Sequence, residues 1–84
     1  MHRSTVRSHE RAAELDKLFG SSAELAARVL DEIESEPDHR WQPQELVDAT
    51  GVTVLDVMLI VARLTVADFV THDGIGSGYR AIAP

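Results

Sequence analysis

The chain has 84 residues and a formal net charge of −6, from 8 lysine and arginine residues against 14 aspartate and glutamate residues. This length accommodates one small domain. The absence of cysteine excludes a disulfide framework and a thiolate metal cluster. No stretch approaches the roughly 20 apolar residues of a membrane span, and no apolar segment follows the first charges as in a secretory signal. We therefore expect a cytoplasmic protein without membrane contact, and the charge balance disfavours a strongly basic nucleic-acid binder.

The charge is unevenly distributed along the chain. Residues 1–19 contain four basic and three acidic residues, a net charge of +1, whereas residues 20–84 contain four basic and eleven acidic residues, a net charge of −7. The sequence predicts a basic arm with a short amphipathic helix over residues 1–20, followed by an acidic domain over residues 21–84. The alternative for the arm is a poorly ordered terminus, because chain ends usually fray.

Helical periodicity predicts two helices in the first half of the chain. Apolar residues recur at helical spacing over residues 9–19, and Gly20 stands where a helix ends. Ser21, Ser22 and Glu24 fit a capping box at the start of a second helix. Pro37 ends that helix, because the residue before a proline avoids the helical conformation.

The second half predicts a helix pair and a hairpin. Residues 40–42 form a possible short strand, and Pro43 suits the first turn of a helix that Gly51 closes. Thr53 is the predicted cap of a fourth helix over about residues 54–66. Residues 69–72 and 79–82 are predicted strands, joined by a glycine-rich loop over residues 73–78.

This order of elements is typical of a winged helix-turn-helix domain. The stretches with the best match are Val29–Ile33, Pro43–Val52, Asp56–Met58, Leu64, Phe69–Val70 and Gly78–Tyr79. They resemble the C-terminal winged domain of the DNA-processing protein A family over most of the chain. The resemblance implies an α+β, mostly helical fold: a three-helix core and a small β-hairpin wing, here with an extra N-terminal helix. Asp68 departs from the glycine that many winged helices have there, although aspartate tolerates the left-handed conformation better than most residues.

The fourth helix would be the recognition helix of such a domain. Its predicted inward side chains are Val54, Val57, Met58, Val61 and Leu64. Its predicted outward side chains are Leu55, Asp56, Leu59, Ala62 and Arg63, with Ile60 at the boundary. Base edges are read by hydrogen-bonding side chains, and this outward face offers only Arg63. Because the helix is apolar on most sides, an alternative phase would place Leu55 and Leu59 in the core.

The first functional hypothesis is a DNA-binding transcriptional regulator, which would act as a homodimer on double-stranded DNA. The predicted DNA-binding residues are Arg63, Arg80, Tyr79, Thr53, Arg3 and Arg7. The predicted dimer element is the helix over residues 9–19, with Leu15, Leu18 and Phe19. The net charge opposes this hypothesis, because phosphate attraction supplies most non-specific affinity for DNA.

The second hypothesis is a non-catalytic protein-interaction module on a winged-helix scaffold, in which a partner docks on the fourth helix or this helix itself forms the dimer interface. Leu55, Leu59 and Ala62 line up along the outward face of the fourth helix, and such an apolar stripe usually marks a protein contact. No serine elbow, cysteine nucleophile or histidine pair at metal-ligand spacing is present. We therefore predict no enzymatic activity, no catalytic or metal-binding residue, no cofactor and no small-molecule substrate.

Overall fold

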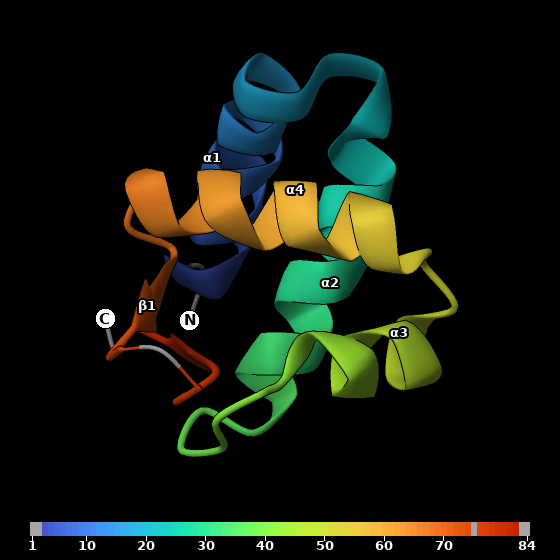
Figure 1. The fold of residues 1–84 in the computed structure, drawn as a ribbon. Helices are drawn as coiled ribbons and strands as arrows, with labels where there is room; N and C mark the ends of the chain where they lie inside the picture. The colour runs from blue at the N-terminus through green and yellow to red at the C-terminus, as the bar shows by residue number, and fades with distance from the viewer. Residues whose placement is uncertain (1–2, 75, 83–84) are drawn as a thin grey trace.

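Helices make up most of the fold, and a β-hairpin follows them (Figure 1). The computed structural model describes residues 3–74 and 76–82, with side chains described from Glu10 onward. The elements are α1 (Arg3–Phe19), the 3-10 turn η1 (Gly20–Ser22), α2 (Ala23–Ser35), α3 (Pro43–Thr50), α4 (Val54–Val66), β1 (Val70–His72) and β2 (Tyr79–Ala81). The predicted α+β, mostly helical class is confirmed.

The first helix is longer than predicted and is docked on the rest of the fold. α1 begins at Arg3 rather than near residue 9, and it contacts α2. Leu15 is only 2% exposed and belongs to the same buried cluster as the core residues of α2 and α4. Arg11 forms ion pairs with Asp31 and Glu34 of α2. Through Leu15, α1 therefore shares one buried core with the helices that follow it.

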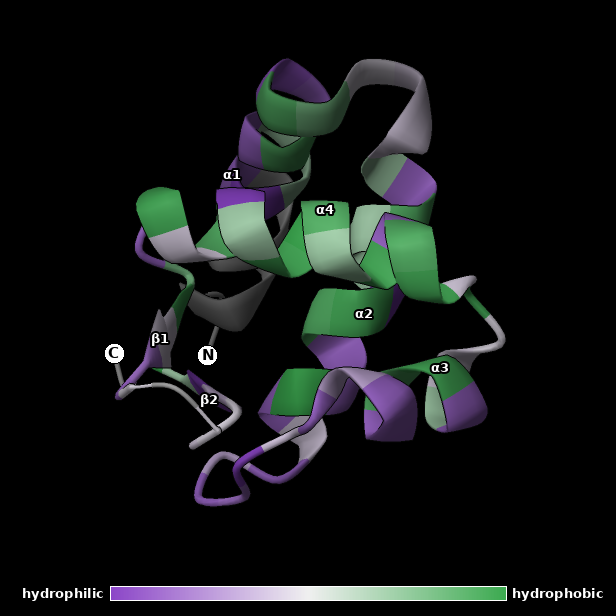
Figure 2. Ribbon diagram, viewed as in Figure 1, coloured by the Kyte–Doolittle hydropathy of each residue, from purple (hydrophilic) through white to green (hydrophobic). Residues whose placement is uncertain are grey.

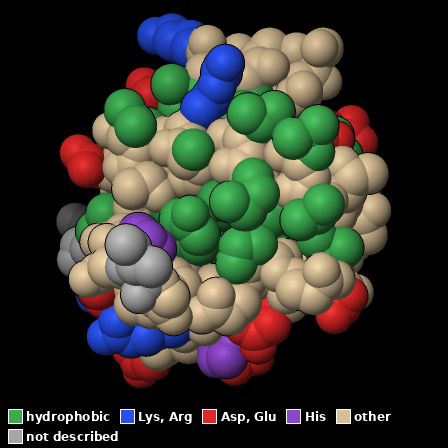
Figure 3. All heavy atoms as spheres, in the orientation of Figure 1, with side chains coloured by type: hydrophobic (Ala, Val, Ile, Leu, Met, Phe, Trp, Pro, Cys, Tyr) green, Lys and Arg blue, Asp and Glu red, His purple; other side chains and the backbone are tan. Residues whose placement is uncertain are grey.

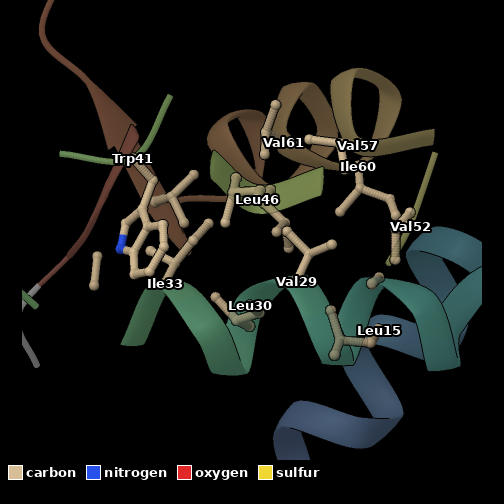
Figure 4. Close-up of a cluster of buried hydrophobic side chains, with 14 residues drawn as sticks. Leu15, Val29, Leu30, Ile33, Trp41, Leu46, Val52, Val57, Ile60 and Val61 are labelled. Atoms are coloured by element: carbon tan, nitrogen blue, oxygen red, sulfur yellow. The ribbon is translucent and has the colours of Figure 1, made fainter. Parts of the chain in front are cut away.

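Helix α2 lies at the centre of the fold. It contacts α1, α3, α4 and β2, and Figure 4 shows its side chains meeting those of the neighbouring elements in one cluster. The predicted capping box at its start is wrong, because Ser22 makes no side-chain cap bond. Residues 20–22 instead form the turn η1, which Gly20 enters with a φ of 57°. The fully buried side chains of α2 are Ala26, Val29, Leu30 and Ile33.

Helices α3 and α4 have the predicted bounds. Gly51 adopts the left-handed conformation with a φ of 77°, which ends α3. The Thr53 hydroxyl then accepts a hydrogen bond from the Asp56 backbone N–H at 3.3 Å, which satisfies one of the first amides of α4. The two helix axes differ by 114°, within the range of the helix-turn-helix motif.

The buried face of α4 differs in part from the prediction. Val57, Val61 and Leu64 are buried as predicted. Ile60 joins them at 3% exposure, whereas Val54 and Met58 are 52% and 44% exposed. The prediction that Val54 and Met58 point inward is wrong. The buried residues follow i, i+3, i+4 and i+7 spacing, which rotates the core-facing stripe away from Val54 and Met58.

The hairpin is attached to the helices through Trp41. β1 and β2 pair antiparallel, with Val70 opposite Ala81. Trp41 adds an isolated bridge to Tyr79, and their backbones exchange two hydrogen bonds of 2.8 Å. Asp68 has a φ of 65°, a left-handed conformation that aspartate tolerates better than most residues. Ile75 of the connecting loop lies outside the described residues.

Among the described helices, none alone is long and apolar enough to cross a membrane. α3 and α4 together have the required length and composition, but they are separate helices at 114° to each other.

Candidate functional site

The outward face of α4 has the most prominent exposed apolar side chains in the described part of the chain. Leu55, Leu59 and Val66 are 68%, 57% and 86% exposed. Together with the exposed Ala62, we call these four residues the α4 stripe. Figure 3 shows apolar side chains gathered over this face, with acidic side chains near its edge. The exposure predicted for Leu55, Leu59 and Ala62 is confirmed.

The composition of α4 explains why this face remains apolar. Among its 13 residues only Asp56 and Arg63 are charged, so α4 has no net charge in a chain whose net charge is −6. Figure 2 shows α4 as an almost continuously hydrophobic helix across the front of the molecule. A helix that is hydrophobic all round is normally buried on all sides, yet the described residues leave the α4 stripe exposed.

A shallow groove of about 160 Å³ runs beside the stripe, between α4 and the corner that joins α1 to α2. Leu59 lines the α4 side of this groove. The other lining residues are Phe19, Ser22, Leu25, Asp56, Ile60 and Arg63. Both charged residues of α4 therefore lie on the groove side of the stripe.

Arg63 is held against the end of α1. Its Nη1 donates a hydrogen bond to the Leu18 carbonyl oxygen at 2.7 Å, and its guanidinium lies 6.0 Å from the centre of the Phe19 ring. The carbonyls of a last helical turn have no partner within the helix, so Arg63 caps α1. The residue predicted to read DNA therefore has a structural role within the chain.

The hairpin brings two arginines to one carboxylate. Arg40 Nη1 donates to Asp73 Oδ2 at 2.6 Å, and Arg80 Nη2 lies 3.4 Å from the same oxygen. The Tyr79 ring stacks on His72 with centres 4.7 Å apart. Arg80 and Tyr79 both lie on β2 as predicted, and the cluster of two arginines and one aspartate has a net charge of +1.

The remaining predicted residues are dispersed. The Thr53 hydroxyl is engaged in the cap of α4. Leu15 is buried in the chain's own core, which corrects its assignment to a dimer interface, whereas Leu18 and Phe19 are half-buried. Arg3 and Arg7 belong to α1, but their side chains lie outside the described part of the chain.

Sequence reasoning missed Val66, Val54 and Met58 as exposed apolar residues. Val66 stands four residues after Ala62, so the i, i+4 spacing of the stripe was the signal that identifies it. Val54 and Met58 border the stripe on the flank away from the groove. Their spacing did not identify them as exposed, because α4 is apolar on that flank as well as on its core side.

One carboxyl group near the helix pair has a shifted pKa. Glu45 Oε1 accepts a hydrogen bond from the Gln42 backbone N–H at 2.8 Å, and His39 Nε2 lies 3.1 Å from Oε2. These contacts, the backbone bond first, lower the pKa of Glu45 below its ordinary value of 4.5. Among the residues that the structure describes, no three histidine or acidic side chains converge as metal ligands do.

Comparisons with protein-family models, with curated proteins and with solved structures found no match.

Proposed function

We propose that the chain is a non-catalytic protein-interaction module whose partner docks on the α4 stripe. The single observation behind this proposal is the exposure of Leu55, Leu59 and Val66 on one face of one helix. Fully burying a leucine or valine side chain contributes about 1.5–3 kcal/mol. A protein surface that covers these residues would remove them from water and so gain that free energy on binding.

The scaffold that we propose is a winged helix-turn-helix domain. The support for it is the 114° angle between α3 and α4, the Gly51 turn between them, and the hairpin that pairs with Trp41. In the DNA-processing protein A family, which the chain resembles, the winged domain is regarded as accessory to the main DNA-binding part. A role in protein contact is compatible with that resemblance.

The charges on the proposed recognition helix favour a protein over DNA. Phosphate contacts need several cations on the contact face, yet α4 carries only Arg63, and Asp56 would repel phosphate. Charge depletion at the centre of a contact face is a mark of protein interfaces. The outward face of α4 matches that pattern.

A photo-crosslinking experiment tests the proposal. Benzoylphenylalanine is placed at Leu59 and, in a matched control, at Ile82, which is 41% exposed but lies outside the stripe. After irradiation of cells that make the chain, we expect nuclease-resistant protein adducts from position 59 and few from position 82. Equal yields at both positions, or adducts that nuclease removes, would contradict the proposal.

DNA binding remains the second candidate function. The observation that favours it is the pair Arg40 and Arg80 on the wing side, which keeps a net charge of +1 after Asp73 is counted. A wing that contacts phosphates, without a recognition helix that contacts base edges, would give weak and non-specific DNA binding.

A further inference from the structure

We infer that the protein docking on the α4 stripe is a second copy of the same chain, with the two α4 helices packed antiparallel about a twofold axis. This inference rests on the proposed function and names its partner. Three observations lead to it: the spacing of the stripe, the sizes of its residues and the positions of the two charges on α4.

The stripe has the spacing of a coiled-coil seam. Leu55, Leu59, Ala62 and Val66 are separated by four, three and four residues. Alternating steps of three and four keep apolar side chains on one side of a helix, where they fit into the matching side of another helix. All four residues are exposed, so none of the residues that the structure describes covers the seam.

The sizes of these residues favour an antiparallel pair. With the twofold axis at the middle of the stripe, Leu59 faces Ala62 of the second copy, and Leu55 faces Val66. Each large side chain then meets a smaller one, which lets facing layers interdigitate. A parallel pair would instead place leucine against leucine and alanine against alanine.

The two charges of α4 are self-complementary in the same arrangement. Asp56 and Arg63 are seven residues apart and both line the groove, so they lie on one flank of the stripe. Antiparallel pairing brings Asp56 of each copy towards Arg63 of the other, which satisfies the reciprocity of a twofold interface. Arg63 has five N–H donors, and the Leu18 carbonyl occupies one of them.

The charge of the whole chain also favours this face as the contact between copies. Two chains of net charge −6 repel each other, and the repulsion is smallest when they meet through surfaces without net charge. α4 is such a surface. A cationic partner would gain more from the acidic positions elsewhere on the chain than from α4.

The expected dimer is weak. A 13-residue helix is about 20 Å long, so the contact lies at the small end of specific interfaces. We expect a dissociation constant on the order of 10 µM, which places the monomer–dimer transition within reach of sedimentation.

The test is sedimentation equilibrium from about 1 to 500 µM. It compares the purified unaltered chain with two variants in which one charge of α4 is reversed. Asp56→Arg and Arg63→Asp each place like charges together in the homodimer, and we expect each to weaken self-association at least tenfold, roughly the cost of one like-charged contact. An equimolar mixture restores both opposite-charge pairs and is expected to dimerise about as well as the unaltered chain. Ile82→Asp is the matched control and is expected to leave self-association unchanged.

A second measurement changes no charge. Because the chain has no cysteine, Leu59→Cys and Ala62→Cys introduce single thiols. Under mild oxidation, the mixture is expected to form the 59–62 disulfide between copies several-fold faster than either variant forms its symmetric disulfide, since bridging requires close Cα atoms.

Three results would overturn the antiparallel homodimer: a monomer throughout the concentration range, a mixture no stronger than its components, or a preference for symmetric disulfides. Failure of the inference is distinguishable from failure of the proposed function. A monomeric chain that still crosslinks from position 59 to a different protein keeps the proposed function, whereas the absence of any protein adduct removes both.

Discussion

Leu59 and Val61 are two residues apart on α4 and have opposite environments. Leu59 is 57% exposed on the stripe, whereas Val61 is fully buried in the core. Burying an unpaired carboxylate costs several kcal/mol, while placing one on an exposed position costs only helix propensity. The same substitution at the two sites therefore separates a surface role from a core role.

We expect Leu59→Asp to lower the melting temperature by no more than about 5 °C at concentrations where the chain is monomeric. Val61→Asp is expected to prevent folding, with a loss of more than about 4 kcal/mol. Thermal unfolding followed by circular dichroism measures both. A large loss of stability in Leu59→Asp would mean that Leu59 is part of the core.

Gly78 is the glycine with the least space for a side chain in the described residues. A Cβ at this position would lie 2.9 Å from the Trp41 carbonyl oxygen, and its φ is 80°. That carbonyl accepts the Tyr79 N–H at 2.8 Å, so it is fixed by the bridge between the hairpin and the helices. Gly51 has a similar φ of 77° but open space around it.

The two glycines make a matched pair for mutation. Gly51→Ala is expected to cost about 1–2 kcal/mol from the left-handed conformation alone. Gly78→Ala adds a backbone clash, and we expect a loss larger by at least about 1 kcal/mol. Urea unfolding gives the difference directly. Equal losses of stability would indicate that the segment around Trp41 can shift away from the hairpin.

At the scale of the element, the start of α3 depends on ionised Glu45. Its carboxylate accepts the Gln42 N–H at the first turn, and this lowers the pKa of Glu45. A carboxyl group whose pKa is lower in the folded state stabilises the fold above its ordinary pKa of 4.5. That contribution is lost as the pH falls below this value through the folded-state pKa.

We expect Glu45→Gln to reduce the pH dependence of unfolding below about pH 4.5 and to lower stability slightly at neutral pH. The free energy of urea unfolding, measured from pH 3 to pH 7 for both chains, tests this. Glu36→Gln, which alters an exposed carboxyl at the end of α2, is the control. Parallel curves for Glu45→Gln and the unaltered chain would show that the cap does not influence folding.

At the scale of the whole molecule, the charge distribution favours the proposed protein contact over DNA binding. Of the five arginines with described side chains, Arg11, Arg40 and Arg80 form ion pairs within the chain and Arg63 caps α1, whereas Arg28 is exposed. Such contacts reduce the attraction for phosphate that would have to offset a net charge of −6.

We therefore expect no micromolar binding of a labelled random duplex at about 50 mM salt, where non-specific attraction is strong. Fluorescence anisotropy measures it. Binding that disappears at about 200 mM salt and weakens in Arg80→Ala would instead support the wing as a phosphate contact, with a salt slope lower by about 1.

Local chemistry in the sequence was sufficient to place the helix pair. Pro43 and Gly51 fix the ends of α3 through their backbone conformations, and the Thr53 hydroxyl caps α4 three residues ahead, so no distant contact is needed. Leu55, Leu59 and Ala62 were likewise identified from spacing alone. The predicted capping box at Ser22 is absent, because residues 20–22 form a 3-10 turn that begins at Gly20 and Ser22 makes no side-chain cap bond.

The tertiary structure decided which sides of the helices are covered. α4 is apolar on most sides, so the sequence could not show that Ile60 is buried while Val54 and Met58 are exposed. Contact with α2, α3 and β1 sets that phase. Likewise, Arg63 contacts Leu18 across 45 residues of sequence, and Leu15 enters the core only because α1 folds back on α2. Residue type and spacing determined the elements and the exposed stripe, whereas packing between distant segments determined which cations are engaged and which face is left for a partner.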